Sequence, residues 1–126
     1  MRGAGARPRR RVLVTDDDPL VRWALGAQLA ELGLDVIEAE SVRETLEREG
    51  EADLVLLDVG LPDGDGLAAA RELLSRRPGR PLLLMTAFAT PELVAEAERA
   101  GVRRCIDKPF DMDAMTRIVG ESLPAE

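Results

Sequence analysis

The chain has 126 residues, 45% of them hydrophobic and 33% charged, a composition that favours one globular domain over a disordered chain. Its single cysteine, Cys105, excludes an internal disulfide, and the lack of histidine excludes Ser–His and Cys–His catalysis, a histidine-bound metal and a phosphohistidine within the chain. No apolar run approaches the roughly 20 residues of a membrane span and no signal-peptide core is present, so we expect a cytoplasmic protein without a membrane partner.

The chain begins with a basic segment. Residues 1–11 contain five arginines and no acidic residue, and we interpret residues 1–10 as a flexible basic arm. The remaining residues hold 12 basic and 24 acidic side chains, a net charge of −12. Because so acidic a body repels a phosphate backbone, nucleic acid is not its expected target. We assign residues 11–122 to one domain and residues 123–126 to a short tail.

From residue 11 onward, apolar runs alternate with helical patterns. We expect strands at 11–14, 35–38, 53–57, 81–85 and 103–107. Asp18 and Pro19 are typical of the cap and first turn of a helix that Gly33 ends. The inward stripe predicted for this helix consists of Leu20, Val21, Ala24, Leu25, Leu29 and Leu32.

Capping residues mark the other helices as well. Ser41 and Glu44 form a capping box at the start of the second helix, and the third helix covers about residues 66–76. Thr90 opens the fourth helix and Asp111 caps the last. The apolar residues expected to face inward from these two helices are Leu93, Val94, Ala97, Ala100, Met112, Met115, Ile118 and Val119.

Five strands joined by crossover helices imply a single doubly wound α/β domain, in which helices cover both faces of a parallel sheet. The strands at 11–14, 53–57 and 81–85 are apolar throughout, which is typical of central strands buried on both faces. The strand at 103–107 is less apolar, as expected for an edge strand.

The stretch LVLLDVGLPDGDG, residues 54–66, runs from an apolar strand into a loop rich in glycine, proline and aspartate. Its first carboxylate, Asp58, should stand at the carboxyl edge of the sheet, which is where open α/β sheets bind ligands. We therefore take Asp58 as the reactive residue. Asp63 and Asp65, each beside a glycine, are interpreted as turn-forming residues.

Three other strands also end in reactive groups. Asp16 and Asp17 follow the first strand, Thr86 follows the fourth, and Lys108, the only lysine, follows the fifth. Because the carboxyl ends of parallel strands meet at one edge, these side chains should surround Asp58. Neighbouring carboxylates repel each other by about 3 kcal/mol per pair at ~5 Å and an effective dielectric near 20, and a hard cation such as Mg²⁺ relieves that repulsion.

This set of groups suits phosphoryl transfer. A carboxylate can attack a phosphoryl group to form an aspartyl phosphate, while a cation, an ammonium and a hydroxyl stabilise the transferring oxygens. Each residue alone also has a plain structural interpretation as a helix cap, a turn residue, a loop hydroxyl or a surface charge. Their coincidence at four strand ends favours a site. Cys105 has no activating base in the sequence pattern and is expected to be a small core residue.

Residues 11–122 resemble the receiver domain of two-component response regulators. The resemblance is carried, in order, by VLVTDDDP, by the LLDVGLPDGDG block, by MTA at 85–87 and by DKPF at 107–110. The MTAF and KPFD segments are similar to receivers of enhancer-binding transcriptional activators. The resemblance implies a flavodoxin-like five-stranded parallel sheet in the order 2-1-3-4-5, with five helices.

The resemblance also implies the roles of the site residues. Asp58 would be the phosphoacceptor, Thr86 would contact the phosphoryl group and Lys108 would form an ion pair with it. The implied Mg²⁺ ligands are Asp16, Asp17 (the more direct of the acidic pair), Asp58 and the backbone carbonyl of Gly60. The donor would be a histidine kinase or a histidine phosphotransfer protein. The domain would then be a signalling phosphoacceptor that catalyses only its own phosphorylation and dephosphorylation, rather than an enzyme.

The chain departs from the family pattern at Cys105. Many family members have an aromatic residue at this position, three before the conserved lysine, and it swings inward when the threonine moves toward the phosphate. With a cysteine here, switching should instead use Thr86, the loop at 87–91 and the helix after it. The last two strand–helix units would then contact either a second copy of the chain or a downstream effector.

Three other functions fit parts of the pattern. A phosphatase of the haloacid dehalogenase type also uses a strand-end aspartate and Mg²⁺, but it needs an acid two residues later, where this chain has Gly60. A binding-only module would not need the full set of carboxylates, threonine and lysine. A flavodoxin-type cofactor binder would need a Ser/Thr-rich phosphate loop after the first strand. The cognate kinase, the output and the oligomeric state stay open from sequence.

Overall fold

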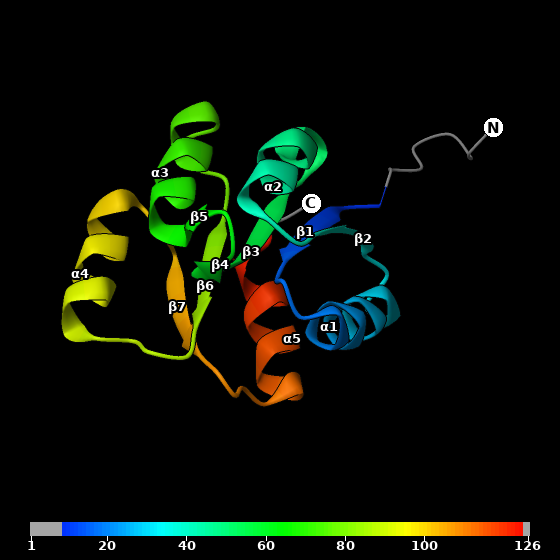
Figure 1. Ribbon diagram of the computed structural model, residues 1–126. Helices are drawn as coiled ribbons and strands as arrows, with labels where there is room; N and C mark the ends of the chain where they lie inside the picture. Colours follow the sequence, from blue (N-terminus) through cyan, green and yellow to red (C-terminus); the bar gives the residue numbers. More distant parts are fainter. Residues whose placement is uncertain (1–8, 125–126) are drawn as a thin grey trace.

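The computed structural model describes residues 9–124, and it shows a five-stranded parallel sheet between two layers of helices (Figure 1). The spatial order is β2-β1-β3-β6-β7, which confirms the predicted order of the five main strands. The strands of the sheet are β1 (Arg11–Thr15), β2 (Asp35–Ala39), β3 (Leu54–Asp58), β6 (Leu82–Thr86) and β7 (Arg104–Asp107). Two short strands, β4 (Gly60–Leu61) and β5 (Gly64–Asp65), form a separate antiparallel pair that the sequence patterns did not predict.

Within residues 9–124, five α-helices cover the sheet, as expected. They are α1 (Pro19–Glu31), α2 (Val42–Arg48), α3 (Gly66–Arg76), α4 (Pro91–Ala100) and α5 (Met112–Ser122), and a short 3-10 helix, η1 (Glu49–Glu51), follows α2. Helices α1 and α5 lie on one face, and α2, α3 and α4 lie on the other (Figure 1). Within the described residues no helix is long and apolar enough to cross a bilayer.

The central strands are fully buried because alternate side chains point into opposite helix layers. Val12, Leu56 and Met85 belong to the core cluster that packs against α1 and α5. Leu13 and Leu57 belong to the cluster under α2, α3 and α4. Parallel pairing in register places residues of one cluster side by side across the strands, so each face of the sheet presents a continuous apolar surface.

Most predicted helix starts have the expected side-chain caps. The side chains of Asp18, Ser41 and Thr90 each accept a hydrogen bond from a backbone N–H in the first turn of their helix. Glu44 completes its box one residue early, because its carboxylate accepts from the N–H of Glu40 rather than from that of Ser41. Asp111 stands at the N-cap of α5 as expected, but its side chain makes no capping hydrogen bond.

The predicted stripe of α1 is wrong at two positions. Leu25 and Leu29 are fully buried, whereas Leu20 is 74% exposed and Leu32 is 53% exposed. At about 100° per residue, Leu20 lies on the side of the helix opposite Leu29. Leu32 is the C-cap residue beyond the last helical turn, so its side chain is not held against the sheet.

The loop between β3 and α3 is more ordered than a simple turn. The Asp63 carboxylate accepts hydrogen bonds from the N–H groups of Val42 (2.7 Å) and Arg43 (3.1 Å), so it joins this loop to the start of α2. Asp65 caps α3 by accepting from the N–H of Leu67. The interpretation of both residues as turn formers therefore understated the role of Asp63.

Candidate functional site

The candidate site lies at the carboxyl ends of β1, β3, β6 and β7. Asp58 is the last residue of β3 and only 6% exposed, and it pairs in register with Met85, one residue before Thr86. Asp16 follows the last residue of β1, whose register partner is Leu57. The parallel sheet thus brings four segments that are distant in the sequence to one edge.

Three carboxylates form the acidic part of the site. Oxygen atoms of Asp16, Asp17 and Asp58 all lie within 4.8 Å of one another. Asp16 and Asp58 are buried, and Asp17 is exposed with no hydrogen bond to its side chain. Oxygen donors at this spacing, one of them free, fit a hard divalent cation that keeps several of its waters.

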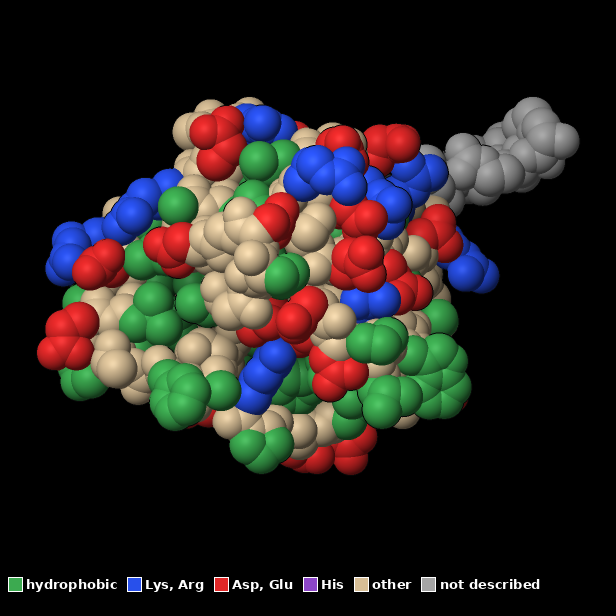
Figure 2. All heavy atoms as spheres, viewed as in Figure 1, with side chains coloured by type: hydrophobic (Ala, Val, Ile, Leu, Met, Phe, Trp, Pro, Cys, Tyr) green, Lys and Arg blue, Asp and Glu red, His purple; other side chains and the backbone are tan. Residues whose placement is uncertain are grey.

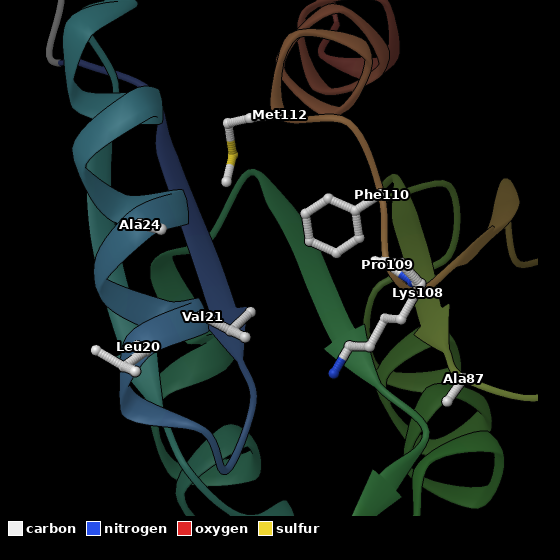
Figure 3. A pocket seen from close by; sticks show the side chains of 8 residues that line it. All are labelled: Leu20, Val21, Ala24, Ala87, Lys108, Pro109, Phe110 and Met112. Atoms are coloured by element: carbon white, nitrogen blue, oxygen red, sulfur yellow. The ribbon is translucent and has the colours of Figure 1, made fainter.

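Lys108 forms ion pairs with the two buried carboxylates, Asp16 and Asp58. Its Nζ lies 2.5 Å from Oδ2 of Asp16 and 3.2 Å from Oδ1 of Asp58. Its backbone N–H donates to the carbonyl of Thr86 at 2.8 Å, which fixes the end of β7 against the end of β6. The Lys108–Pro109 peptide is cis. Figure 3 shows the extended side chain with its ammonium directed away from Phe110.

Burial and charge act in opposite directions on the ionisable groups. Burial raises the pKa of Asp58, the neighbouring Asp16 carboxylate raises it further, and Lys108 offsets only part of the increase. Partial burial alone would lower the pKa of Lys108, but its hydrogen bond with Asp16 and the charges of Asp16 and Asp58 outweigh this, so that pKa is raised. Lys108 therefore holds its proton more tightly than an ordinary lysine, and the Asp58 carboxylate is more basic than that of an ordinary aspartate.

Thr86 and Gly60 border the reactive carboxylate. The Thr86 side chain is buried, and its hydroxyl oxygen accepts a hydrogen bond from the N–H of Phe88 at 3.0 Å, which leaves the hydroxyl proton to donate elsewhere. Gly60 begins β4, and its backbone N–H hydrogen-bonds to the Asp58 carboxylate. Strand pairing places Thr86 near Asp58, because the register partner of Asp58 is Met85, the residue before Thr86. Gly60 lies near Asp58 because it follows two residues later in the chain.

Sequence reasoning missed two residues that support this site. A Cβ added at Gly66 would lie 2.5 Å from the Cα of Val59 and 2.7 Å from the backbone oxygen of Asp58, so only glycine fits there. The sequence feature that could have revealed Gly66 is that it is a glycine at the first position of a helix, where residues with side chains are usual. Arg22 donates to the backbone carbonyl of Asp16 at 2.6 Å, and nothing in the α1 pattern distinguishes it from an ordinary surface arginine.

An apolar hollow of about 490 Å³ opens beside the site, between α1 and the segment joining β7 to α5. Its lining includes Val21, Ala24, Phe110 and Met112, with the Lys108 side chain at the border of the site (Figure 3). Figure 2 shows apolar side chains gathered over α1 next to this hollow. Among the exposed large apolar residues are Leu20 and Trp23, both on α1.

Cys105, which lies on β7, is half-buried and packs against the core on the side of α4. Burial raises the pKa of the Cys105 thiol, and the charges of Glu98 and Asp107 raise it further. The thiol is therefore protonated and unreactive. A hollow of about 350 Å³ beside it, lined also by Val94 and Ala97, lies between α4 and β7.

Comparison with known proteins gives a consistent result. The chain is 36% identical over 115 residues to the regulatory protein AtoC of Escherichia coli K12, a match covering 90% of this chain and 25% of AtoC. It is 38% identical over 112 residues to the transcriptional regulatory protein PdtaR of Mycobacterium tuberculosis, covering 86% of this chain and 54% of PdtaR. The chain therefore spans between a quarter and about half of the length of these relatives.

A solved structure agrees with these relatives in fold. The response regulator receiver domain protein (CheY-like) from Methanospirillum hungatei JF-1 is 28% identical and superposes with a TM-score of 0.86, over 90% of this chain and 93% of that one. Residues 12–120 match the family described as the response regulator receiver domain. With the parallel fold and the strand-end carboxylates already described, this match shows that the chain belongs to the receiver domains of two-component response regulators.

Proposed function

We propose that Asp58 accepts a phosphoryl group from the phosphohistidine of a histidine kinase or a histidine phosphotransfer protein. An Asp58 oxygen attacks the phosphorus, and the P–N bond breaks with its electron pair leaving on the imidazole nitrogen. The observation that carries this proposal is the position of Asp58, which faces both the free Asp17 carboxylate and the Lys108 ammonium. The raised pKa of Asp58 accompanies greater nucleophilicity of its carboxylate.

Lys108 and Thr86 would hold the transferred group. The Lys108 ammonium already lies 3.2 Å from Asp58, so a phosphoryl group on that carboxylate falls within its reach. Thr86 has a hydroxyl proton to donate, and a move toward the phosphoryl group would break its hydrogen bond with Phe88. That break would release the loop before α4, which provides a route to the surface that does not use the Cys105 position.

The cation that this reaction needs is proposed to be Mg²⁺. Asp17 and Asp58 would bind it directly together with the carbonyl of Gly60, and Asp16 would hold its water ligands and Lys108. When bound, Mg²⁺ neutralises charge on the transferring oxygens. The donor set of carboxylate oxygens within 4.8 Å fits such an ion.

The phosphodonor is proposed to dock on the apolar surface of α1. Leu20 and Trp23 are more than two-thirds exposed, and the hollow beside them ends at Lys108, next to Asp58. A donor helix with an apolar face would cover these side chains while presenting its histidine to Asp58. The occupant must carry the phosphohistidine, because the chain itself has no histidine.

The output surface is proposed to be the face formed by α4, β7 and α5. Among the described arginines, only Arg99, Arg104 and Arg117 make no hydrogen bond or ion pair through their side chains, and all three lie on these elements. Acidic side chains on the same face, including Glu98 and Asp113, are also unpaired. A face with unpaired charges of both signs can complement itself, so we propose that a second copy of the chain covers it.

The phosphoacceptor role is tested with a small phosphodonor. Acetyl phosphate with Mg²⁺ should add one phosphoryl group to the wild-type chain, seen by intact-mass measurement, and Asp58→Asn should abolish the addition. Asp63→Asn, a nearby carboxylate bound to the start of α2, is the control that should still be labelled. Unchanged labelling of Asp58→Asn would remove Asp58 from this role.

A further inference from the structure

The peptide group that joins Asp16 to Asp17 is held by a side chain from α1. Arg22 lies one turn into α1 with a side chain only 14% exposed, and its Nη1 donates to the backbone carbonyl of Asp16 at 2.6 Å. Because a peptide group is planar, holding its oxygen restricts rotation of the whole group about the line that joins its two Cα atoms. The direction in which Asp17 leaves the backbone is thereby fixed as well.

Asp17 depends on this contact more than Asp16 does. The N–H of Asp16 donates to the carbonyl of Ala39 at 3.1 Å, and its carboxylate accepts from the N–H of Asp18 and from Lys108. Asp16 is therefore held by three contacts besides the one with Arg22. The Asp17 side chain makes no such contact, so the backbone alone sets the position and direction from which its carboxylate extends.

The guanidinium of Arg22 is itself held from the other side. Its Nε lies 3.2 Å from the Glu38 carboxylate on β2, and its Nη2 lies 3.9 Å from that of Glu40. A planar guanidinium can donate in two directions at once, which the compact point charge of an ammonium does less well. Arg22 therefore links the end of β2 to the turn that carries the acidic pair.

We propose that Arg22 is a positioning residue for the cation site, which orients the Asp17 carboxylate by holding the Asp16–Asp17 peptide group. This inference rests on the proposed function, since it concerns the Mg²⁺ of that reaction. Charge alone makes the opposite prediction, because a guanidinium near the site repels a cation and its removal should tighten Mg²⁺ binding. Positioning predicts weaker binding, because a ligand left free to move must be ordered when the ion binds.

The test is a calorimetric titration of the unphosphorylated full chain with MgCl₂. Arg22→Gln should raise the Kd for Mg²⁺ by about tenfold or more, the scale observed when residues that orient metal ligands are removed. The matched control is Arg48→Gln, which removes the same charge near the same strand. Arg48 contacts the carbonyl of Glu38 and the Glu44 carboxylate but not the acidic turn, so its Kd should stay within about twofold of wild type.

A second readout separates positioning from loss of fold. With acetyl phosphate, Arg22→Gln should need more Mg²⁺ for half-maximal labelling of Asp58 but reach the same plateau rate. Arg22→Lys keeps the positive charge and most of the side-chain stem but loses the planar guanidinium. It should also weaken Mg²⁺ binding, and it therefore tests the positioning role if Arg22→Gln does not fold. Wild-type affinity in both variants would overturn the positioning role and leave the proposed function standing. A wild-type chain that binds no Mg²⁺ would overturn both.

Discussion

At Asp58 the needs of the reaction oppose those of folding. Burial and the Asp16 carboxylate raise the pKa of Asp58 above its unfolded value, so the folded chain binds this proton more tightly than the unfolded chain does. The stability that this proton contributes is fully present at pH values below the pKa that Asp58 has in the unfolded chain. It is lost as the pH rises through the higher pKa that Asp58 has in the folded chain. At neutral pH, therefore, the ionised carboxylate destabilises the metal-free fold.

We predict that Asp58→Asn stabilises the metal-free protein at pH 7. Removing the charge relieves repulsion with Asp16 and leaves Lys108 its 2.5 Å contact, so the gain should be about 1 kcal/mol, or about 4 °C in Tm. Scanning calorimetry in EDTA measures it. Glu98→Gln, an exposed and unpaired position, should leave Tm unchanged. A lower Tm for Asp58→Asn than for the wild type would contradict this destabilising effect of the Asp58 charge. Saturating Mg²⁺ should narrow the difference in Tm between the two proteins, because the ion binds the wild-type site.

Gly66→Ala should disturb the same site through the backbone. The added Cβ would lie 2.5 Å from the Cα of Val59 and 2.7 Å from the backbone oxygen of Asp58, atoms that cannot move without shifting the end of β3. We expect a loss of about 3 kcal/mol in urea unfolding. Gly120→Ala is the control, since a Cβ there meets nothing within 4 Å on α5 and should stabilise by about 0.5–1 kcal/mol. Equal effects of the two substitutions would exclude the contact at Gly66 as the cause.

These residues differ in how well sequence could predict them. Asp58 and Lys108 are chemically distinctive and stand directly at strand ends, so strand periodicity is enough to place them at one edge. Gly66 lies in a Gly/Asp-rich stretch that is also typical of an ordinary turn. Arg22 acts on a carbonyl six residues earlier, through a side-chain direction that only the packed helix determines.

At the scale of elements, the connection from α3 to β6 holds the end of α2 and η1. Arg77 donates to the carbonyls of Gly50 (3.1 Å) and Ala52 (2.7 Å), and Arg80 donates to those of Glu49 (2.7 Å) and Ala52 (3.3 Å). These bonds satisfy carbonyls that helix ends leave free. Sequence did not indicate them, because the partners lie more than 20 residues apart and arginine is common throughout this chain.

Arg80→Met should therefore destabilise the domain strongly. The Arg80 side chain is 2% exposed and pairs with the Glu49 carboxylate at 2.7 Å, so its removal breaks a buried charged contact and leaves that carboxylate with the longer contact to Arg76, at 3.3 Å. We expect a loss of about 3 kcal/mol by urea unfolding. Arg71→Met breaks an exposed pair with Glu96 and should cost less than about 1 kcal/mol. Similar losses in both variants would show that burial of the Arg80 pair is not what matters.

For the molecule as a whole, periodicity alone predicts the fold class, because alternating strands and helices allow a right-handed parallel sheet and little else. The strand order was predicted from the receiver resemblance, and the structure confirms it. Sequence could not predict which side of α1 faces the sheet. Leu20 fits a helical repeat of apolar residues, but in the folded protein Leu25 and Leu29 are the leucines of α1 that are buried against the sheet. Leu20, which is excluded from the core in this way, belongs to the α1 surface proposed for the phosphodonor.

The proposal that a second copy covers the face of α4, β7 and α5 predicts assembly that depends on phosphorylation and charge. The chain loaded with beryllium trifluoride and Mg²⁺ should sediment as a dimer at low salt and as a monomer at high salt, because ion pairs between exposed charges are screened. Arg104→Glu, on β7, should keep the loaded chain monomeric, since each contact would then bring like charges together. The control is Arg43→Glu on α2, outside this face, which should still dimerise. If the loaded wild type stays monomeric at every concentration reached, the second copy is not the occupant of this face.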